Sequence, residues 1–155
     1  MGHGVEWALH CCLDLAWLAS EERPVPAAKL AELHDLPPAY LNKHLQALAR
    51  AGVVASAPGK NGGFRLACPA ERVSLMDIIA AVEGQEPAFR CTEIRLQGLA
   101  AESAPREHCV ISQAMRRGEL AWRSAMAAVT LADIAAEVER KSPGTPARIR
   151  RLASA

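Results

Sequence analysis

The chain has 155 residues, a formal net charge of +1 and 50% hydrophobic residues, which suits one domain or a small domain with an appended arm. Only 4% of the residues are aromatic, so Ala, Leu and Val must fill most of the core, and such a composition favours helices. No run of about 18 apolar residues is present, which excludes a membrane-spanning helix. The N-terminus lacks the basic and apolar segments of a secretory signal, so we expect a cytoplasmic protein.

The first half of the chain predicts three helices and a β-hairpin. Residues 4–20 form about four helical turns, and EERPVP then interrupts the pattern. A short helix follows at 27–33, and a third at 39–51 has leucines at helical spacing and Gly52 as a plausible C-cap. The period then changes to that of two short strands, 53–57 and 64–67, which flank the turn-rich PGKNGG.

The second half predicts helices separated by a long loop. Residues 74–83 form a helix with Ser74 as N-cap and Asp77 in the capping-box position. Residues 84–108 have weak periodicity, and loops of this length are usually functional or disordered. One helix is then predicted from about Val110 to Arg140; at about 45 Å it is too long to fold along a small domain and should pack against a partner chain. The basic segment 141–155 is predicted to be a disordered tail.

The order of elements over residues 4–67 is that of a winged helix-turn-helix, which makes the fold class mainly α with a small β-hairpin wing. Residues 36–66 contain four Lys or Arg and no Asp or Glu, the pattern of a phosphate-binding surface. Side chains early in the recognition helix usually reach base edges, and Asn or Gln can read adenine. The predicted DNA contacts are Tyr40, Asn42, Lys43, His44, Gln46 and Arg50 on the helix, with Lys60, Asn61 and Arg65 on the hairpin. The alternative is a winged-helix fold used for protein contact, with its lysines merely solvated.

Five cysteines in a chain without a signal segment favour reduced, metal-bound or redox-active thiols over structural disulfides. Cys11, Cys12 and Cys68 lie in apolar surroundings and are interpreted as core residues. Cys91 and Cys109 flank the long loop instead, and two thiols need further ligands to hold a metal. Further donors are available on the first helix, where Glu6 and His10 lie on one face one turn apart. The same spacing also fits an ordinary Glu–His pair on the helix surface, so the sequence allows both a metal-ligand pair and a surface pair.

Four segments together carry a family resemblance: LAELHDLPPAYLNKHLQALARAGVV, SAPGKNGGFRLA, SLMDIIAAVEG and the loop around Cys91. Over about residues 4–140 the chain resembles the Rrf-type family of bacterial winged-helix iron–sulfur transcription regulators. Within that family it is most similar to the RsrR-like subgroup of redox sensors, through GVEWALHCC, AFRCTEIR and a cysteine before the last helix. Most members have three loop cysteines, whereas this loop has only Cys91 and Cys109, which argues against a [4Fe–4S] cluster on three thiolates.

The resemblance implies a [2Fe–2S] cluster with Cys91, Cys109, Glu6 and His10 as ligands. It also implies a homodimer with crossing last helices, in which the first helix of one subunit approaches the loop of the other, so that each cluster lies between subunits. The chain is then expected to divide into four parts. These are a DNA-binding domain at 1–83, a cluster-binding loop at 84–108, a dimerisation helix at 109–140 and the tail at 141–155. Trp7, beside Glu6, and His34, in the helix-turn-helix, are the candidate redox relay. The alternatives are that Trp7 is a packing residue and that His34 is an ordinary surface histidine.

The expected function is therefore that of a redox-sensing regulator, most simply a repressor, whose recognition helices enter successive major grooves of a palindromic operator. Three alternatives remain open: a structural zinc at the same ligands, a cluster-free disulfide switch between Cys91 and Cys109, and an adaptor that does not bind DNA. The sequence contains no phosphate loop, nucleophile elbow or HExxH motif, so no enzyme is predicted.

Overall fold

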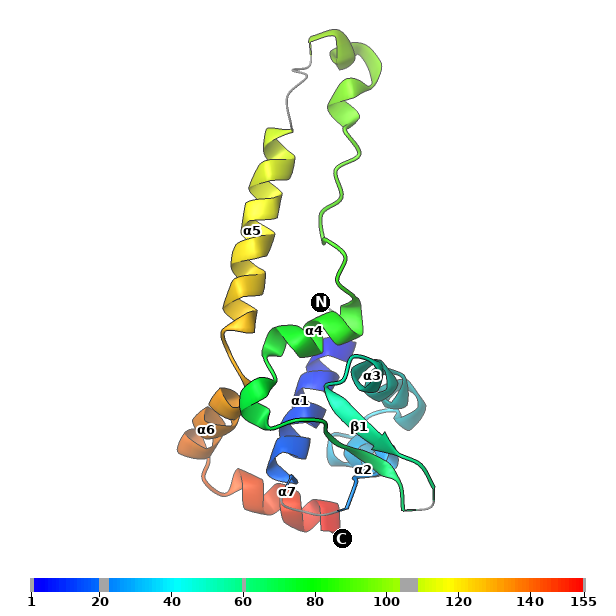
Figure 1. The fold of residues 1–155 in the computed structure, drawn as a ribbon, viewed down its shortest axis with the longest axis vertical. Helices are drawn as coiled ribbons and strands as arrows, with labels where there is room; N and C mark the ends of the chain where they lie inside the picture. Colours follow the sequence, from blue (N-terminus) through cyan, green and yellow to red (C-terminus); the bar gives the residue numbers. More distant parts are fainter. Residues whose placement is uncertain (1, 20–22, 60, 104–108, 155) are drawn as a thin grey trace. The chain divides into compact units, whose positions relative to one another are not determined.

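The computed structural model describes residues 2–19, 23–59, 61–103 and 109–154, which form two compact units (Figure 1). One unit comprises Met1–Gly84 together with Met126–Ala155, and the other comprises Gln85–Ala125. Among the described residues, no helix has both the length and the apolar character that crossing a bilayer requires.

The first unit is built around its N-terminal helix, which lies among the other elements (Figure 1). The elements in chain order are α1 (His3–Trp17), α2 (Ala27–Leu33), α3 (Pro38–Arg50), β1 (Val54–Ala57), β2 (Gly63–Leu66), the 3-10 turn η1 (Ala70–Arg72), α4 (Leu75–Glu83), α6 (Leu131–Lys141) and α7 (Thr145–Ser154). Helix α1 packs on α3, α4, α6, α7 and β2. This arrangement confirms the predicted fold class, a helical domain with a two-stranded hairpin.

Helix α3 is held in place by the leucine spacing seen in the sequence. Leu41, Leu45 and Leu48 are all completely buried, because positions four and three apart lie on one face of a helix. Pro37 and Pro38 begin the helix, where the missing N–H of proline costs nothing. One face of α3 is therefore fixed in the core, and the opposite face is left for other uses.

The hairpin is tied to the segment between α1 and α2. Strands β1 and β2 are antiparallel, with Val54 opposite Leu66 and Ala57 opposite Gly63. Phe64 exchanges two backbone hydrogen bonds of 2.8 Å with Val25 and is buried. A β-carbon on Gly63 would lie 2.3 Å from the Val25 carbonyl oxygen, so this close approach requires glycine.

The predicted single helix from Val110 to Arg140 is wrong: α5 (Val110–Ala127) ends and α6 begins at Leu131. Thr130 is the N-cap of α6, and its hydroxyl accepts the Asp133 amide at 3.1 Å while Asp133 accepts the Thr130 amide at 2.9 Å. Leu131 is buried and its amide bonds to the Val73 carbonyl. The capping box and this pairing make α6 part of the first unit. The predicted DNA-binding domain ended at residue 83 and did not include α6.

The predicted disorder of residues 141–155 is also contradicted, because residues 145–154 form helix α7. Pro146 and Ile149 are buried on its inner face. Arg150 Nε donates to the Trp17 carbonyl at 3.0 Å, and Trp17 Nε1 donates to Glu139 on α6 at 3.1 Å. Apolar and polar contacts together therefore anchor the end of the chain to α1.

Asp14 is the one buried charged side chain among the described residues, with 2% of its surface exposed. Its Oδ2 lies 2.6 Å from Nε2 of His34, which caps the end of α2. This hydrogen bond raises the pKa of His34, although partial burial opposes the shift. Asp14 and His34 therefore form a polar link between α1 and the turn that leads to α3.

The second unit contains the long-loop residues and α5. Two short 3-10 turns, η2 (Ile94–Leu96) and η3 (Gly98–Ser103), replace the structureless loop expected there. The first residues of the second unit are bound to α5 by two hydrogen bonds. Glu119 accepts the Ala88 amide at 3.3 Å, and Arg123 donates to the Glu86 carbonyl at 3.2 Å. Helix α5 itself has no buried residue.

Replacing Thr130 by alanine removes the acceptor for the Asp133 amide at the start of α6. We expect Thr130→Ala to lower the free energy of unfolding by about 1 kcal/mol, measured by denaturant titration. Thr130→Ser keeps the hydroxyl and should stay close to wild type. Equal stability of the alanine and serine variants would show that the cap does not stabilise the fold.

Replacing His34 by alanine leaves the buried Asp14 carboxylate without its hydrogen-bond partner. We expect a loss of about 2 kcal/mol near neutral pH, whereas His3→Ala, at an exposed position, should change little. Because the pKa of His34 is raised, its stabilisation is complete below the unfolded-state pKa of about 6.5 and is lost as pH rises through the folded-state pKa. The pH–stability curve of His34→Ala should lack this decline; a parallel curve would contradict the link.

Candidate functional site

The exposed face of α3 carries most of the side chains predicted to contact DNA. Tyr40, the first of these, is 53% exposed. The remainder of this exposed set is Asn42, Lys43, Gln46 and Arg50 on α3, with Asn61 and Arg65 on the hairpin. Lys60 lies outside the described residues. The exposed set combines cationic and amide side chains, as phosphate contact and base recognition require.

His44 lies against α1 rather than on this exposed face. Its ring centroid is 5.2 Å from that of Tyr40 and 6.3 Å from that of Trp7. A β-carbon on Gly4 would lie 2.4 Å from His44 Cε1, so the ring fits closely over the first turn of α1. Its Nε2 is buried and lacks a hydrogen-bond partner among the described residues, and burial, together with Lys43, lowers its pKa. His44 is therefore a neutral packing contact between α1 and α3.

Trp7 and His34, the candidate relay residues, both lie between the N-terminal helix and the helix-turn-helix. Trp7 is half-buried and meets Tyr40 edge-on, with ring centroids 5.5 Å apart. The His34 ring lies 5.6 Å from the His10 ring as well as on Asp14. Two sets of contacts therefore connect the Glu6–His10 segment to α2 and α3.

Glu6 and His10 are both exposed side chains on α1. Glu6 lies 3.9 Å from the imidazole of His3, and its side chain is 66% exposed. Cys11 and Cys12, next to His10, are completely buried, and burial raises the pKa of Cys11 to about 12. The adjacent thiols are therefore core groups as predicted, and the donors that α1 presents at its surface are the carboxylate and the imidazole.

Cys91 and Cys109 come together in the second unit. Both are half-buried and line one hollow of about 920 Å³, together with Phe89 and Glu93. The Cys91 thiol is a hydrogen-bond partner of Cys109 and also lies 3.7 Å from Glu93 Oε1. The sequence indicated these two thiols from their place at either end of the loop, and the structure brings them together.

Cys109 directly precedes the first residue of α5, where helix amides are free to bind an anion. The backbone N–H of Ser112 is the largest of the influences that lower the pKa of the Cys109 thiol. The N–H of Ile111, the Cys91 thiol and the charge of Arg95 act in the same direction, and burial opposes them. This is the environment of a thiolate that binds metals or reacts with oxidants.

Three residues that contact the candidate site residues were not identified from the sequence: Asp14, Glu93 and Arg95. Asp14 could have been found from its sequence setting, since an acid inside the apolar run CCLDLAW must be paired when buried. Glu93 adopts a left-handed backbone with φ of 52° and binds Arg95 Nε at 2.8 Å, which sequence spacing does not indicate. Among the described residues, no group of three or more His, Cys, Asp or Glu is gathered; Glu6 and His10 belong to one unit, and the two cysteines to the other.

The sequence matches the family model described as "Rrf2: Iron-dependent Transcriptional regulator" over residues 1–137. It is 30% identical over 139 residues to the putative HTH-type transcriptional regulator YffB of Lactococcus lactis, covering 90% of this chain and 88% of that protein. It is also 38% identical over 85 residues to the HTH-type transcriptional regulator IscR of Vibrio vulnificus, which is 55% of this chain and half of that protein.

Solved structures give the same fold. The structure described as "T. potens IscR" has a TM-score of 0.69 at 23% identity, covering 92% of this chain and 90% of that one. CymR of B. subtilis, described as the global cysteine regulator, has a TM-score of 0.68 at 23% identity over 88% and 96% of the two chains. An oxidized form of Staphylococcus aureus CymR matches with a TM-score of 0.63 at 26% identity over 87% and 94%. The chain belongs to the Rrf2 family and is a DNA-binding transcriptional regulator rather than an enzyme.

Proposed function

We propose that this protein is a redox-sensing repressor in which the state of a [2Fe–2S] site at Cys91 and Cys109 controls the affinity for operator DNA. The observation that carries the proposal is the meeting of these two thiols at the start of α5, under conditions that favour the thiolate. Iron–sulfur clusters are held by thiolates, and their negative charge suits a helix N-terminus.

The remaining ligands are proposed to be Glu6 and His10 on α1. They are exposed, lie one helical turn apart, and supply one oxygen and one nitrogen donor. A [2Fe–2S] cluster on two thiolates, a carboxylate and an imidazole supplies one-electron redox chemistry, and imidazole ligands raise its potential relative to four thiolates. The donor set of the chain therefore fits this group.

The protein is proposed to act as a homodimer in which the cluster ligands come from both subunits. Helix α5 supports this arrangement because it leaves Val110, Ile111, Met115 and Leu120 exposed, each by 47% or more. Exposed apolar side chains on a helix that buries none of its residues are typical of a helix that pairs with a partner chain. In a dimer with two-fold symmetry, the two α3 helices would enter major grooves one helical turn apart on a palindromic operator.

Contacts between α1 and α3 are the proposed path from the redox site to DNA. Trp7 rests on Tyr40, and His44 rests on the first turn of α1, so a displacement of that turn changes the position of α3. His10 faces His34, whose bond to Asp14 holds the turn before α3. We propose that Trp7 and His34 relay the change in this way, and that half-site spacing and affinity change with it.

A disulfide switch is the second candidate, because the Cys91 and Cys109 thiols already contact each other. Oxidation by a peroxide would join the two sulfurs, with the two thiol protons and two electrons passing to the peroxide, which gives two waters from hydrogen peroxide or one alcohol and one water from an organic hydroperoxide. This switch uses neither Glu6 nor His10. Glu6→Ala should therefore abolish sensing if the cluster proposal is correct and preserve it if the disulfide alone is the switch.

Anaerobic purification with iron and visible-absorption analysis tests the cluster directly. We expect wild-type protein to be brown, with about two irons per chain, and to give an EPR signal after one-electron reduction. Cys91→Ala and Cys109→Ala should lose the iron, and His10→Ala should lose it or alter the EPR signal. His3→Ala, an exposed histidine on the same helix, is the matched control and should keep the wild-type spectrum.

A colourless protein that contains zinc would contradict the cluster and favour a structural metal at the same residues. A colourless, metal-free protein whose two thiols form a disulfide on oxidation would favour the second candidate. Wild-type spectra in both His10→Ala and Glu6→Ala would contradict the assignment of the α1 ligands.

A further inference from the structure

Helix α7 lies beyond the part of the chain that matches the Rrf2 family model, which ends at residue 137. It is nevertheless a fixed part of the DNA-binding unit and packs on both α1 and α2. Pro146 and Ile149 are buried beneath it, and Arg150 donates to the Trp17 carbonyl. A helix that is docked in this way presents a defined outer surface.

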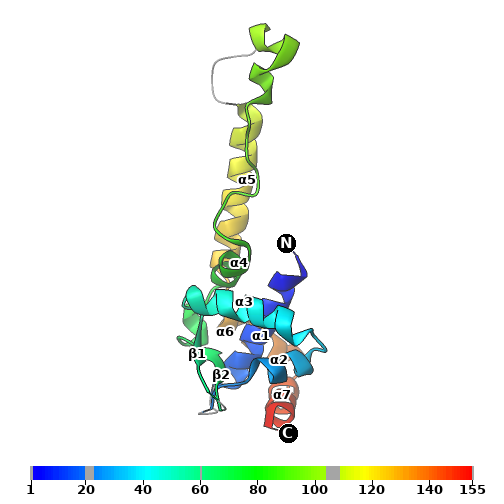
Figure 2. The same cartoon turned by 90° about the vertical axis from the view of Figure 1, so that its right-hand side faces the viewer.

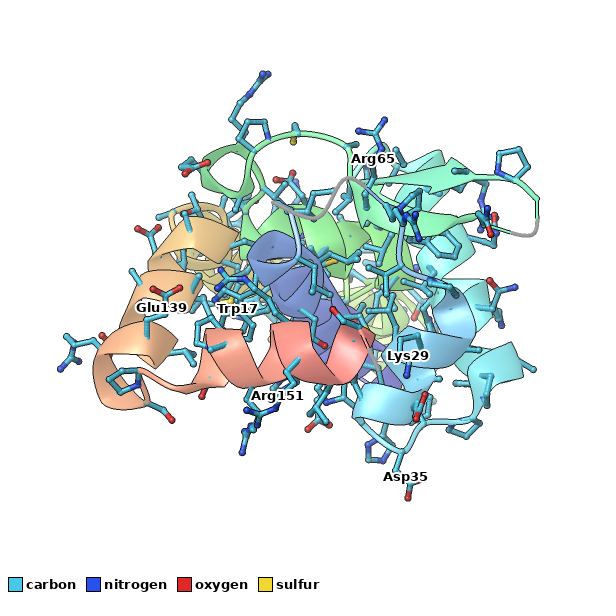
Figure 3. The ribbon with its side chains drawn as sticks, turned by 90° about the horizontal axis from the view of Figure 1, so that it is seen from below. Trp17, Lys29, Asp35, Arg65, Glu139 and Arg151 are labelled. Carbon is cyan, nitrogen blue, oxygen red and sulfur yellow. The ribbon has the colours of Figure 1, made fainter. Side chains whose placement is uncertain are left out.

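The outer surface of α7 is strongly cationic. Residues 142–155 contain three arginines and no Asp or Glu, whereas the whole chain has a net charge of only +1. Arg148, Arg150 and Arg151 are all exposed. In Figure 3, Arg151 projects from α7 away from the Trp17 side of the helix. This concentration of one sign of charge favours an anionic partner.

The C-terminal end of α7 lies beside the hairpin. Ser154 and Ala153 line a surface hollow of about 480 Å³ together with Asn61 of the hairpin and Arg23. Figure 2 shows this end of α7 on the side of the unit where α2 and α3 also lie. Lys29 of α2 lies close to the same end of α7 in Figure 3. Helix α7 therefore adjoins α2, whose Lys29 pairs with Glu32 at 3.0 Å, whereas Arg65 of the hairpin lies on the opposite side of the unit in Figure 3.

We propose that α7 is a third element of the DNA interface and that its arginines contact phosphates flanking the half-site read by α3. In helix-turn-helix proteins the helix before the recognition helix crosses the DNA backbone, and α7 packs against that helix, α2. A guanidinium pairs with a phosphate through two parallel N–H bonds, which makes arginine well suited to this contact. The proposal rests on the DNA binding of the family and does not depend on the redox site.

Arg148→Gln/Arg151→Gln is the variant of choice, because both side chains are exposed and Arg150 is left to anchor the helix. Binding is measured against salt with a mixed-sequence duplex of about 40 base pairs, which needs no known operator. Loss of four phosphate contacts per dimer should reduce the slope of log K against log salt by about 3 to 4, and affinity at low salt should fall at least about tenfold. Hydroxyl-radical footprints on a selected operator should lose their outermost protection.

Arg140→Gln/Lys141→Gln is the matched control, since it removes two positive charges from α6 in the same unit. Both side chains already pair with Glu137, so they should contribute little to DNA binding. Because phosphate contacts carry no sequence information, the α7 variant should weaken operator and mixed-sequence DNA equally. Both variants are expected to fold, which circular dichroism and thermal unfolding would verify.

An unchanged salt slope in the folded Arg148→Gln/Arg151→Gln variant would overturn the proposal. An equal decrease in slope for the α6 control would also overturn it, because the effect would then follow net charge rather than the position of α7. Neither result depends on iron, so failure of this proposal is distinguishable from failure of the redox proposal.

Discussion

Helix α1 packs against α3, the proposed recognition helix, with one face and exposes Glu6 and His10 on another, and this arrangement positions the other elements of the first unit. The buried face places Ala8, Cys11 and Cys12 in the core, where they fix the helix axis. Trp7 and Gly4 at the start of α1 meet Tyr40 and His44 of α3. Because the core is close-packed, a shift of α1 cannot be absorbed locally and must move its neighbours.

The polar contacts of α1 give this packing its specificity. Asp14 is buried and must be paired, so its bond to His34 fixes the turn between α2 and α3 relative to α1. At the other end of the helix, Trp17 and Arg150 attach α6 and α7. The N-terminal helix thus links α3, the exposed donor pair and the cationic α7, and we propose that it is the point at which DNA affinity is controlled.

Periodic apolar patterns made the DNA-binding fold predictable from sequence, as the leucines at 41, 45 and 48 illustrate. The capping box at Ser74 was recognised, yet an equivalent box at Thr130 and Asp133 was overlooked because the apolar pattern continues across it. Helix α7 was mistaken for a tail since its basic composition hides the buried pair Pro146 and Ile149. The meeting of Cys91 and Cys109 depends on tertiary contacts with α5, and the left-handed turn at Glu93 has no clear local signal.

The redox state of the cluster is proposed to set the affinity of the protein for its operator, so operator affinity is measured in both redox states. An operator recovered by selection from random duplexes, labelled with a fluorophore, is titrated anaerobically with oxidised protein and with dithionite-reduced protein at one salt concentration. We expect dissociation constants that differ by about tenfold or more, equivalent to at least about 1.4 kcal/mol. Equal affinities, with EPR confirming that the cluster was reduced, would contradict this proposal.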